Sequence, residues 1–136
     1  MYFNNSLGEI ELNPQGFLGE TNGERLISNM SPLIIKTAEG INTIGSPGAD
    51  RISSSLALVI NNFTQNKDWK ESINKPRYHV NMDGSIRAEP GVKNISNNLT
   101  VTEPNDMYFG GVCFTGIDAE LFTYGDKRRG DATWKN

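Results

Sequence analysis

Two short runs early in the chain, rich in isoleucine and other apolar residues, predict two strands joined by a turn. The runs cover residues 32–36 and 40–44, and the Ala-Glu-Gly between them is typical of a turn. The apolar residues that follow recur with the spacing of a helix. This spacing predicts a helix over 50–64 and a short second helix over 68–73 that ends before Pro76. The apolar stripe of the longer helix consists of Ile52, Leu56, Val59, Ile60 and Phe63.

The C-terminal half is rich in short strand-like runs. Residues 78–81 and 85–88 predict a hairpin, because the Asp83-Gly84 pair between them is a type I′ turn signal. Taken together, the pattern predicts an α+β fold in which helices lie on one face of an antiparallel sheet. Further strands are predicted over 99–102, 107–115 and 120–124, with a turn at 116–118.

The segment Gly-Ser-Pro-Gly-Ala-Asp at 45–50 joins the second predicted strand to the longer predicted helix. A chain that breaks at Gly and Pro and at once forms a helix leaves several backbone N–H groups without a helical acceptor. The helix dipole adds partial positive charge to them. Such a turn can hold a phosphate, a carboxylate or the oxyanion of an acyl-transfer intermediate. The local pattern alone favours a simpler interpretation, a strand-to-helix connection with glycines for geometry.

Length and charge restrict the possible partners. With 136 residues the chain can form one domain with a modest core. Its net charge of −3 and pI near 5.1 give no basic field for nucleic acid or an anionic membrane. We therefore predict no nucleic-acid partner and no membrane association. The first residues do not resemble a signal peptide, and the single cysteine excludes a disulfide framework, so a cytoplasmic location is slightly favoured.

Side chains suited to independent catalysis or metal binding are scarce. His79 is the only histidine and lies in an alternating run, which favours a structural or surface-strand role. Cys113 is predicted to lie on a core strand, and the two residues are too few for a zinc site. The sequence contains no phosphate-loop or dinucleotide motif, and we predict no metal and no cofactor. The Lys-Arg-Arg run at 127–129 is interpreted as a solvated turn.

Several short blocks occur in an order that resembles a known enzyme family. Almost end to end, the chain is similar to the C-terminal part of the small subunit of gamma-glutamyltransferases (gamma-glutamyltranspeptidases), members of the N-terminal-nucleophile hydrolase superfamily. The Ser-Asn-Met-Ser-Pro and Gly-Ser-Pro-Gly blocks are specific, and the others are supportive. The resemblance implies that the chain is part of an αββα sandwich and favours a functional turn at 45–50. The blocks are Asn-Asn-Ser-Leu-Gly-Glu (4–9), Arg-Leu-Ile-Ser-Asn-Met-Ser-Pro (25–32), Gly-Ser-Pro-Gly-Ala-Asp-Arg-Ile (45–52), Lys-Pro-Arg-Tyr-His (75–79), Glu-Pro-Gly (89–91) and Gly-Asp-Lys-Arg-Arg-Gly (125–130).

The resemblance implies an oxyanion hole and a carboxylate site. Gly48 and Ala49 match an adjacent pair whose backbone N–H groups form the oxyanion hole. The family usually has Gly at the second position, so Ala49 would be strained if its φ were positive. Ser28 and Asn29 match a Ser-Ser pair that binds the α-carboxylate of the gamma-glutamyl group, and an Asn amide can also donate to a carboxylate.

The resemblance also implies a site for the substrate α-ammonium. Glu9 matches an Asp that pairs with this group, and it keeps the charge with one more methylene. Ser6 stands where a Gln commonly contacts the ammonium, and its shorter side chain would need a bridging water. Without the family context, Ser28 is a turn or cap residue and Glu9 a solvated carboxylate.

The family nucleophile has no counterpart in this sequence. It is a Thr that self-cleavage exposes at the start of the small subunit, upstream of the block at 4–9. We therefore expect residues 1–136 to be a single domain, the C-terminal piece of a split or truncated enzyme. Its partner would be a chain that carries the Thr nucleophile and the large-subunit part, or a second copy in a homodimer. The missing part would leave uncovered a sheet edge near residues 2–4 and the apolar face of the 50–64 helix.

The function implied is gamma-glutamyl transfer or hydrolysis on a small compound such as glutathione, with the nucleophile supplied from elsewhere. This chain is not expected to be active alone. The alternative is a non-catalytic remnant that binds a small amino acid or serves as an assembly module. The sequence leaves open the specific substrate, the balance of transfer and hydrolysis, the oligomeric state and whether Met1 is the natural start.

Overall fold

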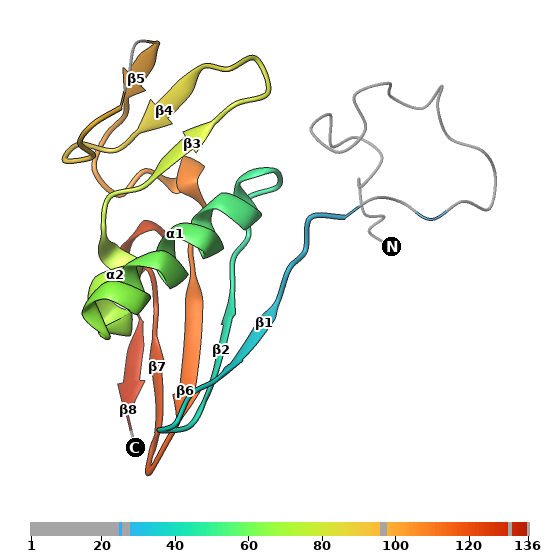
Figure 1. The fold of residues 1–136 in the computed structure, drawn as a ribbon, viewed down its shortest axis with the longest axis vertical. Helices are drawn as coiled ribbons and strands as arrows, with labels where there is room; N and C mark the ends of the chain where they lie inside the picture. Colours follow the sequence, from blue (N-terminus) through green and yellow to red (C-terminus); the bar gives the residue numbers. More distant parts are fainter. Residues whose placement is uncertain (1–24, 26–27, 96–97, 131, 136) are drawn as a thin grey trace.

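Five strands form an antiparallel sheet in the order β1-β2-β6-β7-β8 (Figure 1). The computed structural model describes residues 25, 28–95, 98–130 and 132–135. The predicted strand end at 2–4 lies outside these residues. The two strands predicted first are confirmed as β1 and β2, which pair in antiparallel register. The strands are β1 (Leu33–Lys36), β2 (Ile41–Gly45), β6 (Cys113–Ile117), β7 (Leu121–Tyr124) and β8 (Thr133–Lys135).

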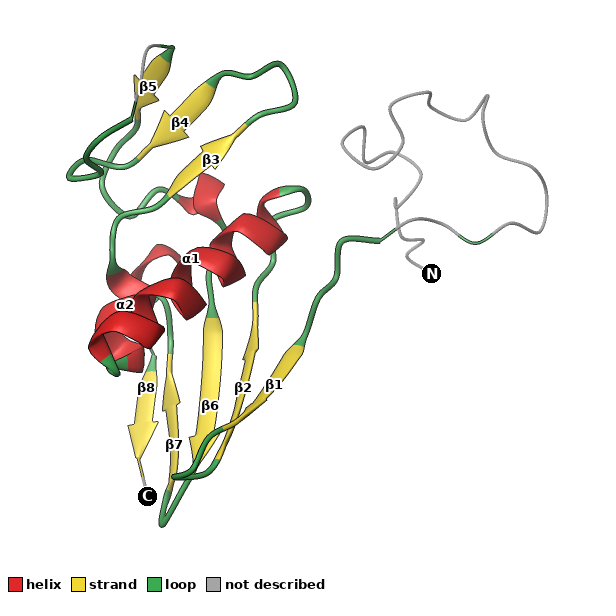
Figure 2. Ribbon diagram, in the orientation of Figure 1, coloured by secondary structure: helices red, strands yellow, loops and turns green. Residues whose placement is uncertain are grey.

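Two helices, α1 (Arg51–Asn66) and α2 (Trp69–Asn74), cover one face of this sheet (Figure 2). Both predicted helices are thus confirmed. α2 begins where the Asp68 carboxylate accepts a hydrogen bond from the Glu71 N–H, an N-cap that satisfies one end-of-helix donor. Within the described residues, no helix is both long and apolar enough to cross a bilayer.

The core lies between the helices and the sheet. The predicted apolar stripe of α1 packs there, so the expectation that this helix face is uncovered is wrong. Ile60 and Phe63 are partly buried against the same cluster. The fully buried members are Ile44, Val112 and Phe114 from the sheet side, Ile52, Leu56 and Val59 from α1, and Trp69 and Ile73 from α2.

The uncovered apolar surface lies instead on the opposite face of the sheet. Successive side chains of a strand point to opposite faces, so the residues that alternate with the core positions face outward. Ile34 is 79% exposed and Trp134 50% exposed. They lie at the two ends of one row across the sheet, which runs through Thr43, Thr115 and Thr123. Three more exposed apolar residues lie on this face: Ile41, Ile117 and Leu121.

A second, smaller sheet contains β3 (Tyr78–Val80), β4 (Ile86–Ala88) and β5 (Leu99–Val101). β3 and β4 form the predicted hairpin, whereas β5 pairs with β4 in parallel. The predicted type I′ turn is wrong, because Gly84 has a φ of 79° but Asp83 does not have a positive φ. The Asp83 carboxylate accepts hydrogen bonds from the Ser85 N–H and hydroxyl, which fold the turn in another way.

The segment predicted as a strand over 107–115 is a strand only in its second part. Met107–Phe109 forms a 3₁₀ helix, η3, that begins where the Asp106 carboxylate accepts a hydrogen bond from the Tyr108 N–H. Cys113, predicted to lie in the core, is exposed, because its neighbour Phe114 takes the inward position. β6 continues to Ile117, so the turn predicted at 116–118 lies at 118–120.

Candidate oxyanion turn and its surroundings

The turn at 45–50 leads directly from the end of β2 into the N-terminus of α1. Its carbonyl groups are used: the Arg51 N–H donates to the Gly48 oxygen at 2.9 Å, and the Ile52 N–H to the Ala49 oxygen at 3.2 Å. Among the described residues, no protein group accepts a hydrogen bond from the N–H of Gly48, Ala49 or Asp50. Three consecutive donors at the positive end of a helix form an anion-binding corner.

Both residues assigned to the oxyanion hole have positive φ. Gly48 has a φ of 137°, which few residues other than glycine adopt, and Ala49 has a φ of 52°. An L-residue with a side chain is disfavoured in this left-handed region by about 1–2 kcal/mol. Ala49 is therefore strained. This is the outcome that we expect for an alanine with a positive φ at this position. Its backbone N–H still remains available as a donor.

Gly110 and Gly111, which follow η3, pack against the backbone of the 45–50 turn. The Gly111 N–H donates to the Ser46 hydroxyl at 3.2 Å. A Cβ at Gly110 would lie 2.4 Å from the Pro47 oxygen and 2.7 Å from the Ser46 hydroxyl, so only glycine allows this approach. Gly110 has a φ of 75°. Sequence reasoning missed these two residues. The Gly-Gly pair within an apolar run was the signal that a backbone passes close by.

Of the two predicted substrate-binding residues that the structure describes, Asn29 contacts the turn and Ser28 does not. The Asn29 amide donates to the Ala49 oxygen at 3.5 Å. The Ser28 hydroxyl is exposed and accepts a hydrogen bond from the Met30 N–H at 3.2 Å, so it also has the local turn role that was its alternative interpretation. Ser6 and Glu9 lie outside the described residues.

Asp50 and Arg51 attach the turn to the small sheet and to η3. The Asp50 carboxylate lies 3.4 Å from the His79 Nε2, and the Ser54 hydroxyl lies 2.9 Å from the His79 Nδ1. Arg51 forms an ion pair with Asp50 and donates to the Tyr108 oxygen at 3.0 Å. His79 is 8% exposed, in keeping with the predicted structural role. Burial raises the pKa of Tyr108, although Arg51 and Arg87 oppose this shift.

A buried ion cluster corrects the interpretation of 127–129 as a solvated turn. Arg128 is 4% exposed and forms ion pairs with Glu89 and, at 3.0 Å, with Asp126. Arg77, 1% exposed, pairs with Asp126 at 2.6 Å. Two cations and two carboxylates compensate each other inside the fold, and this is why basic residues can be buried here. Three blocks that were only supportive in the sequence thus meet at one point. We call these four side chains, Arg77, Glu89, Asp126 and Arg128, the ion cluster.

The ion cluster also satisfies backbone groups near the turn. Arg77 donates to the Phe109 oxygen at 3.0 Å, and the Val112 N–H donates to Asp126 at 2.9 Å. The cluster therefore fixes both sides of the Gly110–Gly111 support. Burial lowers the pKa of Arg77 despite the opposing charge of Asp126. Burial also acts to lower the pKa of Arg128, but the hydrogen bonds and charges of Glu89 and Asp126 outweigh it and raise that pKa.

No metal centre is visible in the part of the chain that the structure describes. It contains no group of three or more His, Cys, Asp or Glu side chains that could hold an ion. The turn offers backbone donors instead, which can stabilise a developing negative charge on oxygen but cannot attack a carbonyl carbon.

Solved structures with the same fold define the class of protein. The Bacillus anthracis transpeptidase CapD, in crystal form II, is 26% identical with a TM-score of 0.67, over 85% of this chain and 74% of that chain. The gamma-glutamyltranspeptidase of Pseudomonas nitroreducens, complexed with L-DON, is 20% identical with a TM-score of 0.63, over 80% of this chain and 63% of that chain. The fold is that of an N-terminal-nucleophile hydrolase, which confirms the predicted fold class.

The family follows from the sequence comparisons. A family model described as gamma-glutamyltranspeptidase matches residues 3–131. The chain belongs to the gamma-glutamyltranspeptidase family, as the resemblance implied. A relative in Bacillus subtilis (strain 168), the glutathione hydrolase proenzyme, is 32% identical over 130 residues, which cover 89% of this chain. The chain spans 22% of the length of that relative.

Proposed function

We propose that this chain contributes the oxyanion hole and part of the substrate site for gamma-glutamyl transfer or hydrolysis. The attacking Thr would come from a segment or partner chain that lies outside this sequence. The observation that carries the proposal is the row of three N–H donors at Gly48, Ala49 and Asp50, at the N-terminus of α1, for which the described residues offer no acceptor. Membership of the gamma-glutamyltranspeptidase family suggests that the acyl group is gamma-glutamyl. The glutathione hydrolase relative makes glutathione a candidate substrate.

Asn29 is the described side chain best placed to orient the substrate. Its amide lies 3.5 Å from the Ala49 oxygen, next to the N–H donors of the turn. An amide that leaves this long hydrogen bond can donate to a carboxylate without unfolding any element. Ser28, Ser6 and Glu9 would complete the site, with Glu9 pairing with the substrate ammonium.

The open face of the five-stranded sheet supports the need for a partner. It exposes isoleucine, leucine and tryptophan side chains over several adjacent strands, with Ile34 and Trp134 at its two ends. Ile41, Ile117 and Leu121 lie at paired positions on β2, β6 and β7, and exposed apolar side chains grouped in this way are typical of a surface that another layer covers. In the proposal, the rest of an αββα sandwich packs here and brings the Thr nucleophile to the turn.

Release of a chromogenic amine from a gamma-glutamyl anilide tests the function. The 136-residue chain alone should be inactive, and mixing it with a polypeptide that presents the family's N-terminal Thr segment should give activity. Activity of the chain alone would show that no partner is required. Ligand-induced stabilisation by glutamate, without activity in the mixture, would instead favour the amino-acid-binding alternative.

Substitutions at Asn29 test the carboxylate site in the active mixture. Asn29→Ala should raise KM about tenfold, because a donor to a charged group is lost. Asn29→Asp should raise it further, since the new carboxylate would repel the substrate carboxylate. Asn61→Asp on the exposed side of α1 is the matched control and should leave KM unchanged. Equal effects of Ala and Asp at position 29 would contradict direct contact with the substrate carboxylate.

A further inference from the structure

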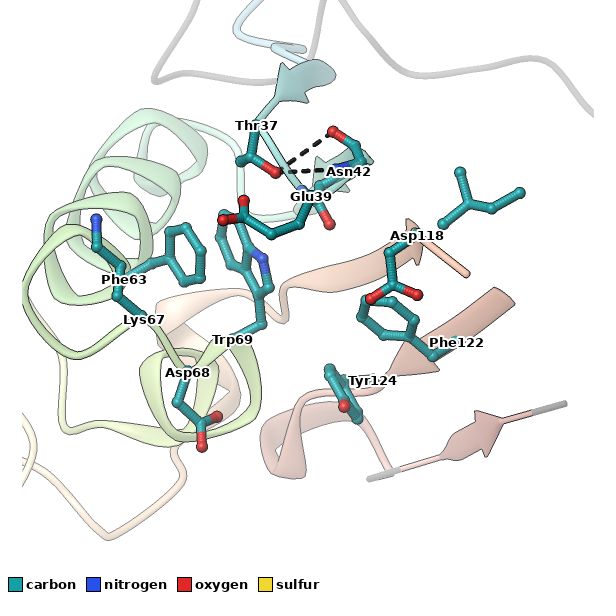
Figure 3. Close-up of a pocket in the computed structure, with 12 residues that line it drawn as sticks. Thr37, Glu39, Asn42, Phe63, Lys67, Asp68, Trp69, Asp118, Phe122 and Tyr124 are labelled. Carbon is teal, nitrogen blue, oxygen red and sulfur yellow. Dashed lines mark hydrogen bonds between the residues drawn. The ribbon is translucent and has the colours of Figure 1, made fainter. Parts of the chain in front are cut away.

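A cavity of about 500 Å³ lies at the opposite end of α1 from the 45–50 turn (Figure 3). It opens between the C-terminal end of α1, the start of α2 and the ends of the sheet strands. α1 has 16 residues, so a helix of about 24 Å separates the two places. This cavity is therefore a separate feature from the candidate oxyanion site.

Aromatic rings form the wall of the cavity. Phe63 and Trp69 stack with ring centroids 3.7 Å apart and planes at 7°. Phe122 and Tyr124 from β7 line it too, and Figure 3 shows the four rings around the same space. The faces of aromatic rings carry negative charge from their π electrons and attract cations.

A buried amide without a hydrogen bond faces the cavity. Asn42 is 7% exposed and lines the cavity from β2. In the described part of the chain, its side-chain amide makes no hydrogen bond. The neighbouring strand has Gly116 at the paired position, and a Cβ there would lie 2.7 Å from the Asn42 side-chain oxygen and 2.5 Å from the Phe122 ring. The Asn42 amide is not among the described side-chain groups that are both enclosed and unpartnered, so its atoms reach the open space of the cavity, where the oxygen can accept a hydrogen bond.

Carboxylates dominate the charge at the rim. Glu39 and Asp118 lie on turns at the end of the sheet, and both line the cavity. The pKa of the Glu39 carboxyl is lowered, because the backbone N–H of Glu39 and the Thr37 hydroxyl donate hydrogen bonds to its charged form. Lys67 is the one cation among the lining residues, with its Nζ 5.7 Å from the Phe63 ring centroid.

We propose that this cavity binds a small organic ammonium ion with an apolar body. The body would lie against Trp69 and Phe122, and the ammonium would donate to the Asn42 oxygen while the rim carboxylates neutralise its charge. An anion would meet carboxylates and aromatic faces, and a neutral ligand would leave the carboxylates unused. Aromatic walls with acidic groups are the usual chemistry of ammonium recognition. This inference does not depend on the proposed enzymatic function.

Tryptophan fluorescence of the full 136-residue chain provides a direct binding test. The chain has two tryptophans, so Trp134→Phe leaves Trp69 as the reporter. Phenethylammonium is the probe, and 2-phenylethanol is the neutral probe of nearly equal shape. We expect saturable quenching by phenethylammonium and at least tenfold weaker binding of the alcohol. Equal binding of the two, or no saturable signal with the cation, would overturn the proposal.

Charge variants must move the affinity in opposite directions. Glu39→Gln and Asp118→Asn should each weaken phenethylammonium binding about two- to fivefold, because they remove attraction at an exposed rim. Lys67→Gln should strengthen it by a similar factor, since it removes a competing cation. Glu103→Gln, at an exposed position outside the cavity, is the matched control and should change nothing. A change of the same sign in all three rim variants would exclude charge recognition.

Discussion

The ion cluster and the turn at 45–50 are both built from strongly polar groups, but the cluster pairs nearly all of them within the protein: among its described side-chain atoms, Arg77 Nε alone is buried without a hydrogen-bond partner. In the cluster, Arg77 and Arg128 meet two carboxylates and several backbone carbonyls, and all four side chains are nearly inaccessible. In the turn, three N–H groups have no protein acceptor among the described residues, and Ala49 has a strained φ of 52°. The first arrangement neutralises its charges within the fold, whereas the second presents backbone donors of the kind that can bind a negative charge.

The two regions are also physically connected. Arg77 and Asp126 hold the backbone on both sides of Gly110, and Gly110 lies directly under Pro47 of the turn. The ion cluster therefore helps to hold the 45–50 turn in place. Substitutions in the two regions can separate these two roles.

Arg128→Met should destabilise the chain most. It leaves the Glu89 and Asp126 carboxylates buried with one cation fewer, a change that costs about 3–5 kcal/mol. Lys127→Met is the control at an exposed neighbour and should cost about 0.5 kcal/mol or less. Urea unfolding measures both. Similar stabilities of the two variants would mean that the ion cluster is not a stabilising element.

Gly110→Ala should come next, because it disturbs the support of the turn. The new Cβ would overlap the Pro47 oxygen, and the φ of 75° is unfavourable for alanine, so we expect a loss of about 3 kcal/mol. Gly84→Ala has a similar φ of 79° but open space around it and should cost only about 1 kcal/mol. Thermal unfolding of both variants isolates the steric part. Equal losses would show that the turn can move away from Gly110.

Ser54→Ala should have a moderate effect, since it removes the hydroxyl that contacts the His79 Nδ1 at 2.9 Å. Loss of this hydrogen bond should cost about 1 kcal/mol. Ser53→Ala, one residue earlier on the exposed side of α1, corrects for the higher helix propensity of alanine. If the two variants have the same free energy of unfolding, His79 does not anchor the small sheet through Ser54.

Ala49→Gly should have the smallest effect and the opposite sign. Glycine relieves the left-handed strain, partly offset by the greater freedom of the unfolded chain, for a net gain of up to about 1 kcal/mol. Ala57→Gly, in the interior of α1, is the control and should lose about 1 kcal/mol. Denaturant midpoints measure the difference. A destabilised Ala49→Gly variant would contradict the strained conformation at this position.

Much of the local structure could be predicted from sequence. Short isoleucine-rich runs separated by a turn signal gave β1 and β2 correctly, and the helical spacing of apolar residues gave α1, because an apolar stripe can be buried only by an element of matching period. The first part of 107–115 was predicted wrongly, since an apolar run does not reveal that Asp106 caps a 3₁₀ helix or that Gly110 must meet another backbone. The hairpin pairing was correct, but its turn type depends on the hydrogen bonds of Asp83.

Local sequence pattern was enough to place the strand–turn–helix unit that presents the donors, and the short blocks pointed to the gamma-glutamyltranspeptidase family. The open face of the sheet, the buried arginine in Lys-Arg-Arg and the positive φ of Ala49 became apparent only in the folded chain. These outcomes depend on contacts between segments far apart in the chain. Arg128 can be buried only because the carboxylates of Glu89 and Asp126 are buried beside it. Glu89 is far from the other two residues in the sequence, so no local pattern predicts the contact.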